Sequence, residues 1–349
     1  MMFDYIVRKV LYGILVLWGV ATIVFFLFTI VPGDPVRMML GQRADEKDVI
    51  AIREELGLNQ SVAKQYVNYL NDLSLLSVYN AEKQPCKCLR IASFGEKSLV
   101  VKPPYLRFSY QSKRQVADIL TEAFPNTLIL ASVSIFFAML FGVTLGVLAA
   151  VLNSNFINRL TLFVTTLGMS LPSFFAAILI AWLFGYVLES VTGLGMTGSL
   201  FSVDDYGNGS YLDLKNLILP ALTLGIRPLA VVVELTRTTL LDVMSQDYIR
   251  TAKAKGLRKW RIITVHALRN ALTPVVTAIS GWFASLLAGA VFVEYVFDWK
   301  GIGVVIVDAL DKFDFPVIMG SVLLIGTMLV IINIVVDIIY GVIDPRIRV

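Results

Sequence analysis

"DYIRTAKAKGLRKWRIITVHALRNALTPVV", residues 247–276, is a strongly basic stretch that contains the only histidine of the chain, His266. The rest of the chain is apolar, because hydrophobic residues make up 57% of its 349 residues, charged residues make up 16%, and the mean hydropathy is +0.75. This composition is typical of a membrane protein with several spans. A basic, helix-prone segment is unusual in such a chain, and its role has to be explained.

Six apolar segments are long enough to cross a bilayer, which takes about 20 residues of helix. They are residues 10–31, 126–152, 160–188, 217–235, 271–293 and 316–340. Pro172 inside the third predicts a kink and not a break, because neighbouring helices can satisfy the freed carbonyl. The first is longer than the apolar part of a cleavable signal, so we expect it to be retained. Asp314 is expected to cap the last, with Pro316 in its first turn.

Lysine and arginine in the short loops predict the orientation of the spans. One side of the membrane receives the basic segments, which are the N-terminal Arg8 and Lys9, Arg159, the quoted segment and the C-terminal Arg346 and Arg348. The alternate loops, 189–216 and 294–315, are acid-rich. Both termini and the quoted segment are therefore expected to be cytoplasmic. The net charge of +4 follows largely from this bias, so no nucleic-acid partner is expected.

The segment 32–123 between the first two spans is too long for a simple connection and is expected to fold into a small external domain. Helical patterns follow the capping residues Asp45 and Ser61, and the helical signal fades after Leu73. Residues 86–110 look irregular, because Pro103 and Pro104 block any regular continuation. Cys86 and Cys88 supply half a tetrahedral zinc site, and a bridge across one residue would be strained. We expect no metal or catalytic role for them, although an external location leaves an unusual disulfide open.

The quoted segment indicates two short helices around a turn. We expect Asp247 to cap the first helix and Gly256 to stop it, because glycine tolerates the positive φ of a helix end. The second helix should start near Arg258 and lead into the fifth span. Small residues at 252, 254 and 256 permit another surface to approach closely. Composition alone does not separate such a docking element from a simple positive-inside anchor.

The spacing of the segment does separate the two interpretations. "YIRTAKAKG", nine residues and then "HALRNA" resembles the cytoplasmic motif of ABC-transporter permeases, in the variant of the dipeptide, oligopeptide and nickel importer family. Arg250, Thr251 and Ala252 stand where the general pattern has Glu-Ala-Ala. The resemblance extends over nearly the whole chain, through the stretches "TIVPGDP", "EELGLNQSVAKQYVNYL" and "VDIIYGVIDPRIR". About 30 residues at 75–105 do not fit it and look inserted.

This resemblance implies an all-α polytopic membrane protein of six transmembrane helices, the type I ABC importer permease fold, in a bacterial inner membrane. Residues 1–31 would form the N-terminal span, 32–123 the external segment, and 124–349 the permease core with a cytoplasmic coupling loop at 236–270. The implied partners are a second homologous permease, two cytoplasmic ATPase subunits, an external solute-binding protein and the lipid bilayer. The implied coupling residues are Asp247, Tyr248, Arg250, Thr251, Ala252, Ala254, Gly256, His266, Arg269 and Asn270.

The chain has no Gly-x4-Gly-Lys-Ser/Thr loop to hold phosphates, so we expect a transport subunit and not an enzyme. It should bind no cofactor or metal itself, and ATP would be used by the partner subunits.

Arg227 and Glu234 interrupt the fourth span and lie seven residues apart, on one helix face. A charge at mid-membrane costs about 2.5 to 3.5 kcal/mol on insertion scales, so such residues usually face the bundle interior or a water-filled path. Both are candidates for the translocation path, although Glu234 is nearer the cytoplasmic edge. Arg227 could instead form a structural pair with an acid such as Asp337 or with a residue of the partner subunit.

The expected function is therefore that of a permease subunit of an ATP-driven importer of peptides or a related solute. The sequence leaves open whether the solute is a dipeptide, an oligopeptide, a nickel chelate or glutathione. The alternative is a secondary transporter or channel that acts without ATPase subunits. That class usually has several ionisable groups at mid-membrane, where Arg227 stands nearly alone.

Overall fold

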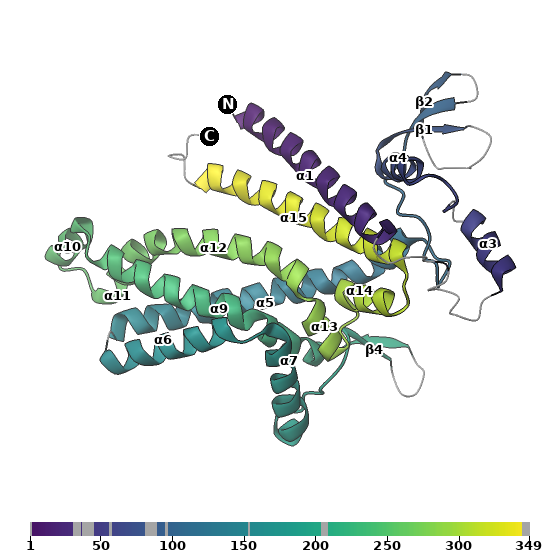
Figure 1. Ribbon diagram of the computed structural model, residues 1–349. Helices are drawn as coiled ribbons and strands as arrows, with labels where there is room; N and C mark the ends of the chain where they lie inside the picture. The colour runs from purple at the N-terminus through teal and green to yellow at the C-terminus, as the bar shows by residue number, and fades with distance from the viewer. Residues whose placement is uncertain are drawn as a thin grey trace. The chain divides into compact units, whose positions relative to one another are not determined.

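The computed structural model describes residues 2–30, 36, 45–55, 58–80, 89–94, 97–152, 154–203 and 209–343. The chain divides into two compact units: the first comprises Met1–Ala123 and Val305–Val330, and the second comprises Phe124–Val304 and Ile331–Arg348. Five of the described helices are long and apolar enough to cross a membrane, and one bent pair of helices brings the total to six if it counts as one span. The predicted helical membrane fold is thus confirmed (Figure 1).

The first unit is built around the N-terminal span. Its helices are α1 (Met2–Ile30), α3 (Glu46–Glu55), α4 (Val62–Leu73), the start of α5 (Val116–Leu152) and parts of α14 (Ile302–Asp311) and α15 (Phe315–Ile343). The predicted apolar face of α4 packs on α1, where Tyr66 and Tyr69 lie against Phe25 with ring centroids 5.2 and 5.3 Å apart. Ser61 is the N-cap residue of α4 as predicted, although its side chain makes no capping hydrogen bond.

The expectation that residues 86–110 are irregular was wrong for 89–94 and 97–101, which form strands, whereas residues 102–107 have no regular structure. Strands β1 (Leu76–Asn80), β2 (Leu89–Phe94) and β3 (Lys97–Val101) form an antiparallel sheet in the order β1-β3-β2. Asn71 of α4 fixes the first strand, because its side chain accepts a hydrogen bond from the Val78 N–H (3.1 Å) and donates one to the Val78 carbonyl (3.3 Å). Cys86 and Cys88 lie outside the described residues, as do Arg346 and Arg348 of the tail.

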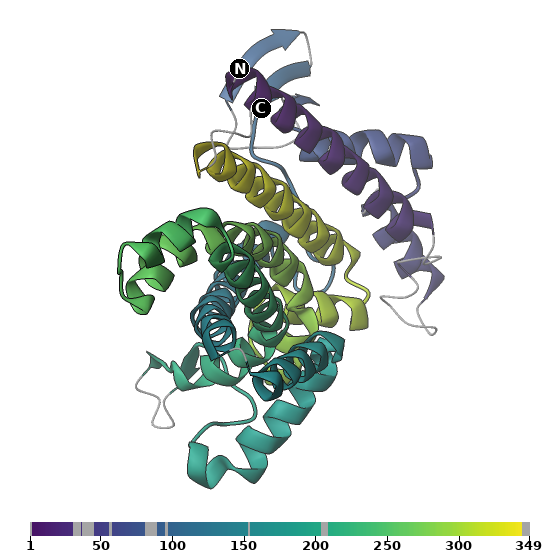
Figure 2. The same cartoon turned by 90° about the vertical axis from the view of Figure 1, so that its left-hand side faces the viewer.

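The second unit contains the helices that surround the candidate sites. They are the rest of α5, then α6 (Asn155–Ser170), α7 (Ser173–Trp182), the π-helical η1 (Leu183–Val187), α8 (Glu189–Thr192), α9 (Lys215–Met244), α10 (Asp247–Ala254), α11 (Lys259–Arg261), the π-helical η2 (Ile262–Ala267), α12 (Leu268–Gly289) and α13 (Val291–Phe297). A two-stranded ribbon pairs β4 (Phe201–Val203) with β5 (Ser210–Leu212). Figure 2 shows these helices from the end at which α10 lies.

Glycine brings α5 and α9 close together. A Cβ atom on Gly142 would lie 2.7 Å from the Val232 side chain, and one on Gly146 would lie 2.8 Å from the Val233 carbonyl oxygen. The two glycines are four residues apart and therefore share one helix face, the small-xxx-small arrangement that membrane helices use for close packing. The backbones of these two spans can thus approach closely.

The third predicted span is broken, and the prediction of a kink was wrong. Helices α6 and α7 meet at 106° across Leu171 and Pro172. Leu171 has φ −71° and ψ 128°, and Pro172 has φ −60° and ψ 136°, so both are extended. Proline disfavours the helical conformation of the residue before it, which ends α6 at this point.

Asp314 does precede the last span, but its side chain turns to the segment before α5. Its carboxylate accepts hydrogen bonds from the Ser109 hydroxyl at 2.5 Å and from the Tyr110 N–H at 3.0 Å. The expected side-chain cap of the sixth span is therefore replaced by a tie between two segments that lie about 200 residues apart in the sequence.

Candidate functional site

The basic segment of residues 247–276 folds as the two short helices that its sequence predicts. Helix α10 spans Asp247–Ala254, and a second helical run begins with α11 and continues through η2 into α12. Gln246 occupies the N-cap position, so the expectation that Asp247 caps the helix was wrong by one residue. Asp247 is the first helical residue and accepts a hydrogen bond from the Arg250 guanidinium at 3.2 Å.

Gly256 ends α10 in the left-handed conformation that was predicted, with φ +74°. The Gly256 N–H donates to the Lys253 carbonyl at 3.0 Å, and the Leu257 N–H donates to the Ala252 carbonyl at 3.4 Å. This pair of bonds is the Schellman arrangement of a helix C-terminus. A Cβ atom added to Gly256 would meet nothing within 4 Å, so the surface around it is open.

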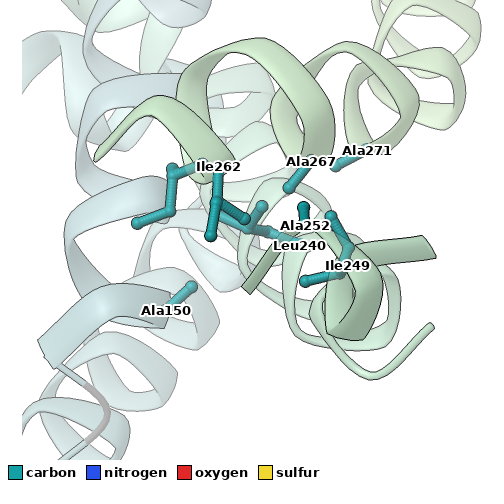
Figure 3. Packing of buried hydrophobic residues seen from close by; sticks show 8 residues of the cluster. Ala150, Leu240, Ile249, Ala252, Ile262, Ala267 and Ala271 are labelled. Carbon is teal, nitrogen blue, oxygen red and sulfur yellow. The ribbon is translucent and has the colours of Figure 1, made fainter. Parts of the chain in front are cut away.

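One face of α10 is anchored in an apolar cluster (Figure 3). The cluster joins α5, α9, α10, η2 and α12 through Ala150, Leu240, Ile249, Ala252, Ile262, Ile263, Ala267 and Ala271. Ile249 is completely buried and lies beside Ala252 and Leu240 in this cluster. Ala252 also faces the cluster, so its small size serves packing within the chain and not the approach of another surface.

The opposite face of α10 is exposed and basic. The exposed residues of this face and of the turn after it are Tyr248, Arg250, Thr251, Lys253, Ala254, Lys255 and Gly256. Beyond the turn, Arg269 and Asn270 are also exposed, whereas His266 is half-buried. The Asn270 amide donates a hydrogen bond to the Tyr248 hydroxyl at 2.8 Å, which ties α10 to the start of α12. The structure thus brings most of the predicted coupling residues onto one surface, with Ala252 beneath it.

The π-helical turn η2 was not foreseen from the sequence. It lies directly under α10, where Ile262, Ile263 and Ala267 belong to the anchoring cluster. A π turn carries more residues per turn than an α-helix, and such turns often occur at functional sites. Periodicity over six residues cannot distinguish a π turn from an α-helix, because the two patterns diverge too little over that length.

Arg227 and Glu234 have separate surroundings in α9. Glu234 lies 3.8 Å from the Arg237 guanidinium, which donates a hydrogen bond to the Asn158 side chain at 3.0 Å. Arg227 instead lines a pocket between α6, α7, α9 and α12 and donates a hydrogen bond to the Met169 carbonyl at 3.3 Å. The role of both residues in a translocation path stays a prediction.

Two family models match this chain. Residues 142–349 match the family described as the binding-protein-dependent transport system inner membrane component, and residues 2–131 match its N-terminal region. The chain belongs to this permease family. It is therefore a multi-pass inner-membrane protein and a permease of the ABC transporter class.

Several relatives of this permease match over 99% of both chains. The di/tripeptide transport system permease protein DppB of Pseudomonas aeruginosa is 34% identical, and the dipeptide transport system permease protein DppB of Escherichia coli is 33% identical. The glutathione transport system permease protein GsiC of Escherichia coli is also 33% identical. The resemblance seen in the sequence is thereby confirmed.

A solved structure shows the same permease fold. A chain of the inward-facing MetNI methionine ABC transporter matches with a TM-score of 0.53 at 16% identity, over 65% of this permease and 97% of that chain. At this identity the match supports the fold alone.

Proposed function

We propose that this permease forms, together with partner subunits, the translocation path of an ATP-driven importer for peptides or a related small solute. The similarity to permeases named for di/tripeptide, dipeptide and glutathione transport supports the solute class. A second homologous permease would complete the path, an external solute-binding protein would deliver the solute, and two cytoplasmic ATPase subunits would use the ATP.

The anchored helix α10 is the observation on which this proposal rests. Its buried side is fixed by Ile249, and its outer side presents Arg250, Lys253 and Lys255 to solvent. An exposed basic helix that is rigidly joined to three spans suits an acidic groove on an ATPase subunit, because opposite charges favour the encounter. Movement of that subunit would then be passed to the spans.

Gly256 offers the sharpest test of this docking. A residue with a Cβ atom costs roughly 1 to 2 kcal/mol in the left-handed conformation, and a bulky charged side chain would also obstruct an approaching surface. We expect Gly256→Asp to insert normally but to lower the ATPase subunits that co-purify by about tenfold or more and to abolish uptake. Gly256→Asn should do less, since asparagine tolerates this conformation and carries no charge.

The chain provides a matched control in Gly193, which ends α8. It has φ +62°, and an added Cβ atom would likewise meet nothing within 4 Å. Gly193→Asp should therefore carry the same local strain and leave both ATPase association and uptake intact. If Gly256→Asp behaves like Gly193→Asp, the basic segment is only a topological anchor and the proposed docking is wrong.

A further inference from the structure

The pocket beside Arg227 lies at the break between α6 and α7, where these helices face α9 and α12. It is formed by the α6–α7 junction, α9 and α12, has a cavity volume of about 80 Å³, and has Leu171, Ser173, Arg227, Trp282 and Ser285 in its wall. No aspartate or glutamate is among the described residues that line it. The wall thus combines one positive charge, hydroxyl groups and apolar surface.

The depth of Arg227 makes its charge costly without a function. At a rise of 1.5 Å per residue, Arg227 lies about 15 Å from Leu217 and about 12 Å from Leu235, the two ends of the predicted span within helix α9. Charged residues at such depth usually face an interior path or a partner. The guanidinium has five N–H donors, and the hydrogen bond to the Met169 carbonyl uses one of them.

The break at Pro172 accounts for the position of that guanidinium. In an unbroken helix, the Met169 carbonyl would accept from the backbone N–H four residues later. The bend of 106° at this point frees the carbonyl, and Arg227 donates to it instead. This bond holds the guanidinium at the pocket while its other donors stay available for a ligand.

We propose that this pocket binds the carboxylate of the solute during its passage, with Arg227 as the counter-charge. The inference rests on the proposed importer function and adds the chemical group that the path recognises. A guanidinium binds a carboxylate through two parallel N–H···O bonds, which lysine cannot reproduce. The N-terminus of α7, whose first residue Ser173 is in the pocket wall, has no side-chain cap and adds partial positive charge there.

The test compares two probes in proteoliposomes that hold the complete transporter with its binding protein. The probes are alanyl-alanine and alanyl-alanine amide, which lacks the carboxylate. The binding protein is the same in every assay, so its own preference cancels when a variant is compared with the wild type. We expect Arg227→Gln to lower uptake of alanyl-alanine by about tenfold or more while uptake of the amide changes less than about threefold. Arg227→Lys should be intermediate.

A second arm restores the charge chemically. Arg227→Cys, made with Cys86→Ser and Cys88→Ser, is treated with a cationic trimethylammonium thiosulfonate or with an anionic sulfonate thiosulfonate. The cationic reagent should recover uptake of alanyl-alanine, and the anionic one should not. If the wild-type transporter does not carry the amide, this second arm alone tests whether the positive charge at position 227 is needed for uptake of alanyl-alanine.

Three outcomes would overturn the inference. Equal losses for both probes with equal responses to both reagents would make Arg227 a structural residue. Unchanged uptake of alanyl-alanine by Arg227→Gln would remove it from recognition altogether. A wild-type transporter that carries neither peptide in an ATP-dependent manner would instead overturn small peptides as the solute class, and this inference with it.

Discussion

Glu294 is a fully buried carboxylate in α13, outside the spans at Lys259–Leu287 and Phe315–Ile338. Its Oε2 atom accepts a hydrogen bond from the Gly303 N–H at 2.6 Å, which satisfies a free donor at the start of α14. Burial raises the pKa of Glu294 to about 7, although bonds from Thr127, Gly303 and Val304 partly oppose the rise. The carboxyl group therefore titrates near neutral pH.

The raised pKa predicts a dependence of stability on pH. The folded state keeps the proton of Glu294 up to about pH 7, whereas an unfolded chain loses it near pH 4.5, so stability should fall by about 3 kcal/mol as pH rises through this window. Glu294→Gln keeps an acceptor for Gly303 and removes the titration. We expect its melting midpoint in detergent to vary less between pH 5 and 8 than that of the wild type, by roughly 5 °C.

Glu189→Gln is the control for this measurement, because Glu189 is exposed. It should follow the wild-type pH profile. A Glu294→Gln profile that matches the wild type would show that another group produces the dependence.

Single residues were predictable from the sequence where their role is local. Gly256 was assigned to a helix end because the helical pattern stops beside it, and its φ of +74° confirms this. The role of Glu294 was not predicted, and the side-chain cap predicted for Asp314 was wrong, because the partners of both are fixed by the fold: Asp314 accepts hydrogen bonds from residues about 200 positions earlier. No pattern of neighbouring residues carries that information.

At the scale of elements, the sheet β1-β3-β2 makes the insert removable in a defined way. Asn80 and Lys97 are paired across β1 and β3, so a two-residue Asn-Gly turn can replace residues 81–96 and close a hairpin. This shortening removes β2 and leaves the ties of Tyr105 and Lys102 to Asp72 in place. We expect ATP-driven uptake to fall less than about twofold, because the insert is predicted to lie outside the transport machinery.

The measurement is uptake in proteoliposomes, with co-purification of the partner subunits as the check on assembly. A shortened chain that assembles fully but loses uptake would identify the insert as part of a docking surface for the external binding protein.

Long apolar elements were predictable because the length of a span and the absence of charge are local properties of the sequence. The ends of these elements and the breaks within them were harder to predict. Helix α9 continues to Met244, well beyond the predicted end at residue 235, because a polar helix can extend past the membrane when an apolar cluster holds its end. The break at Pro172 depends on which neighbours are present to satisfy freed carbonyls, and a single sequence does not show them.

For the whole molecule, the distribution of lysine and arginine predicts which side each loop faces. In a chain with Cys86→Ser and Cys88→Ser, Gln60→Cys should react with a membrane-impermeant thiol reagent added from outside, and Lys255→Cys should not. Both should react after the membrane is opened with detergent, which controls for intrinsic reactivity. Labelling in the opposite pattern would overturn the predicted topology, including the predicted cytoplasmic location of α10.

The cluster that anchors α10 has a mechanical consequence. Packed protein interiors have low compressibility, and this one joins the ends of α5, α9 and α12 to Ile249 without an intervening loop. A force on α10 should therefore displace all three spans together, because little of it is lost in local deformation of the cluster. If α10 docks on an ATPase subunit as proposed, a deformable contact would let ATP be hydrolysed without movement of the solute. The stiffness of this contact would then set how much ATP is used for each solute transported.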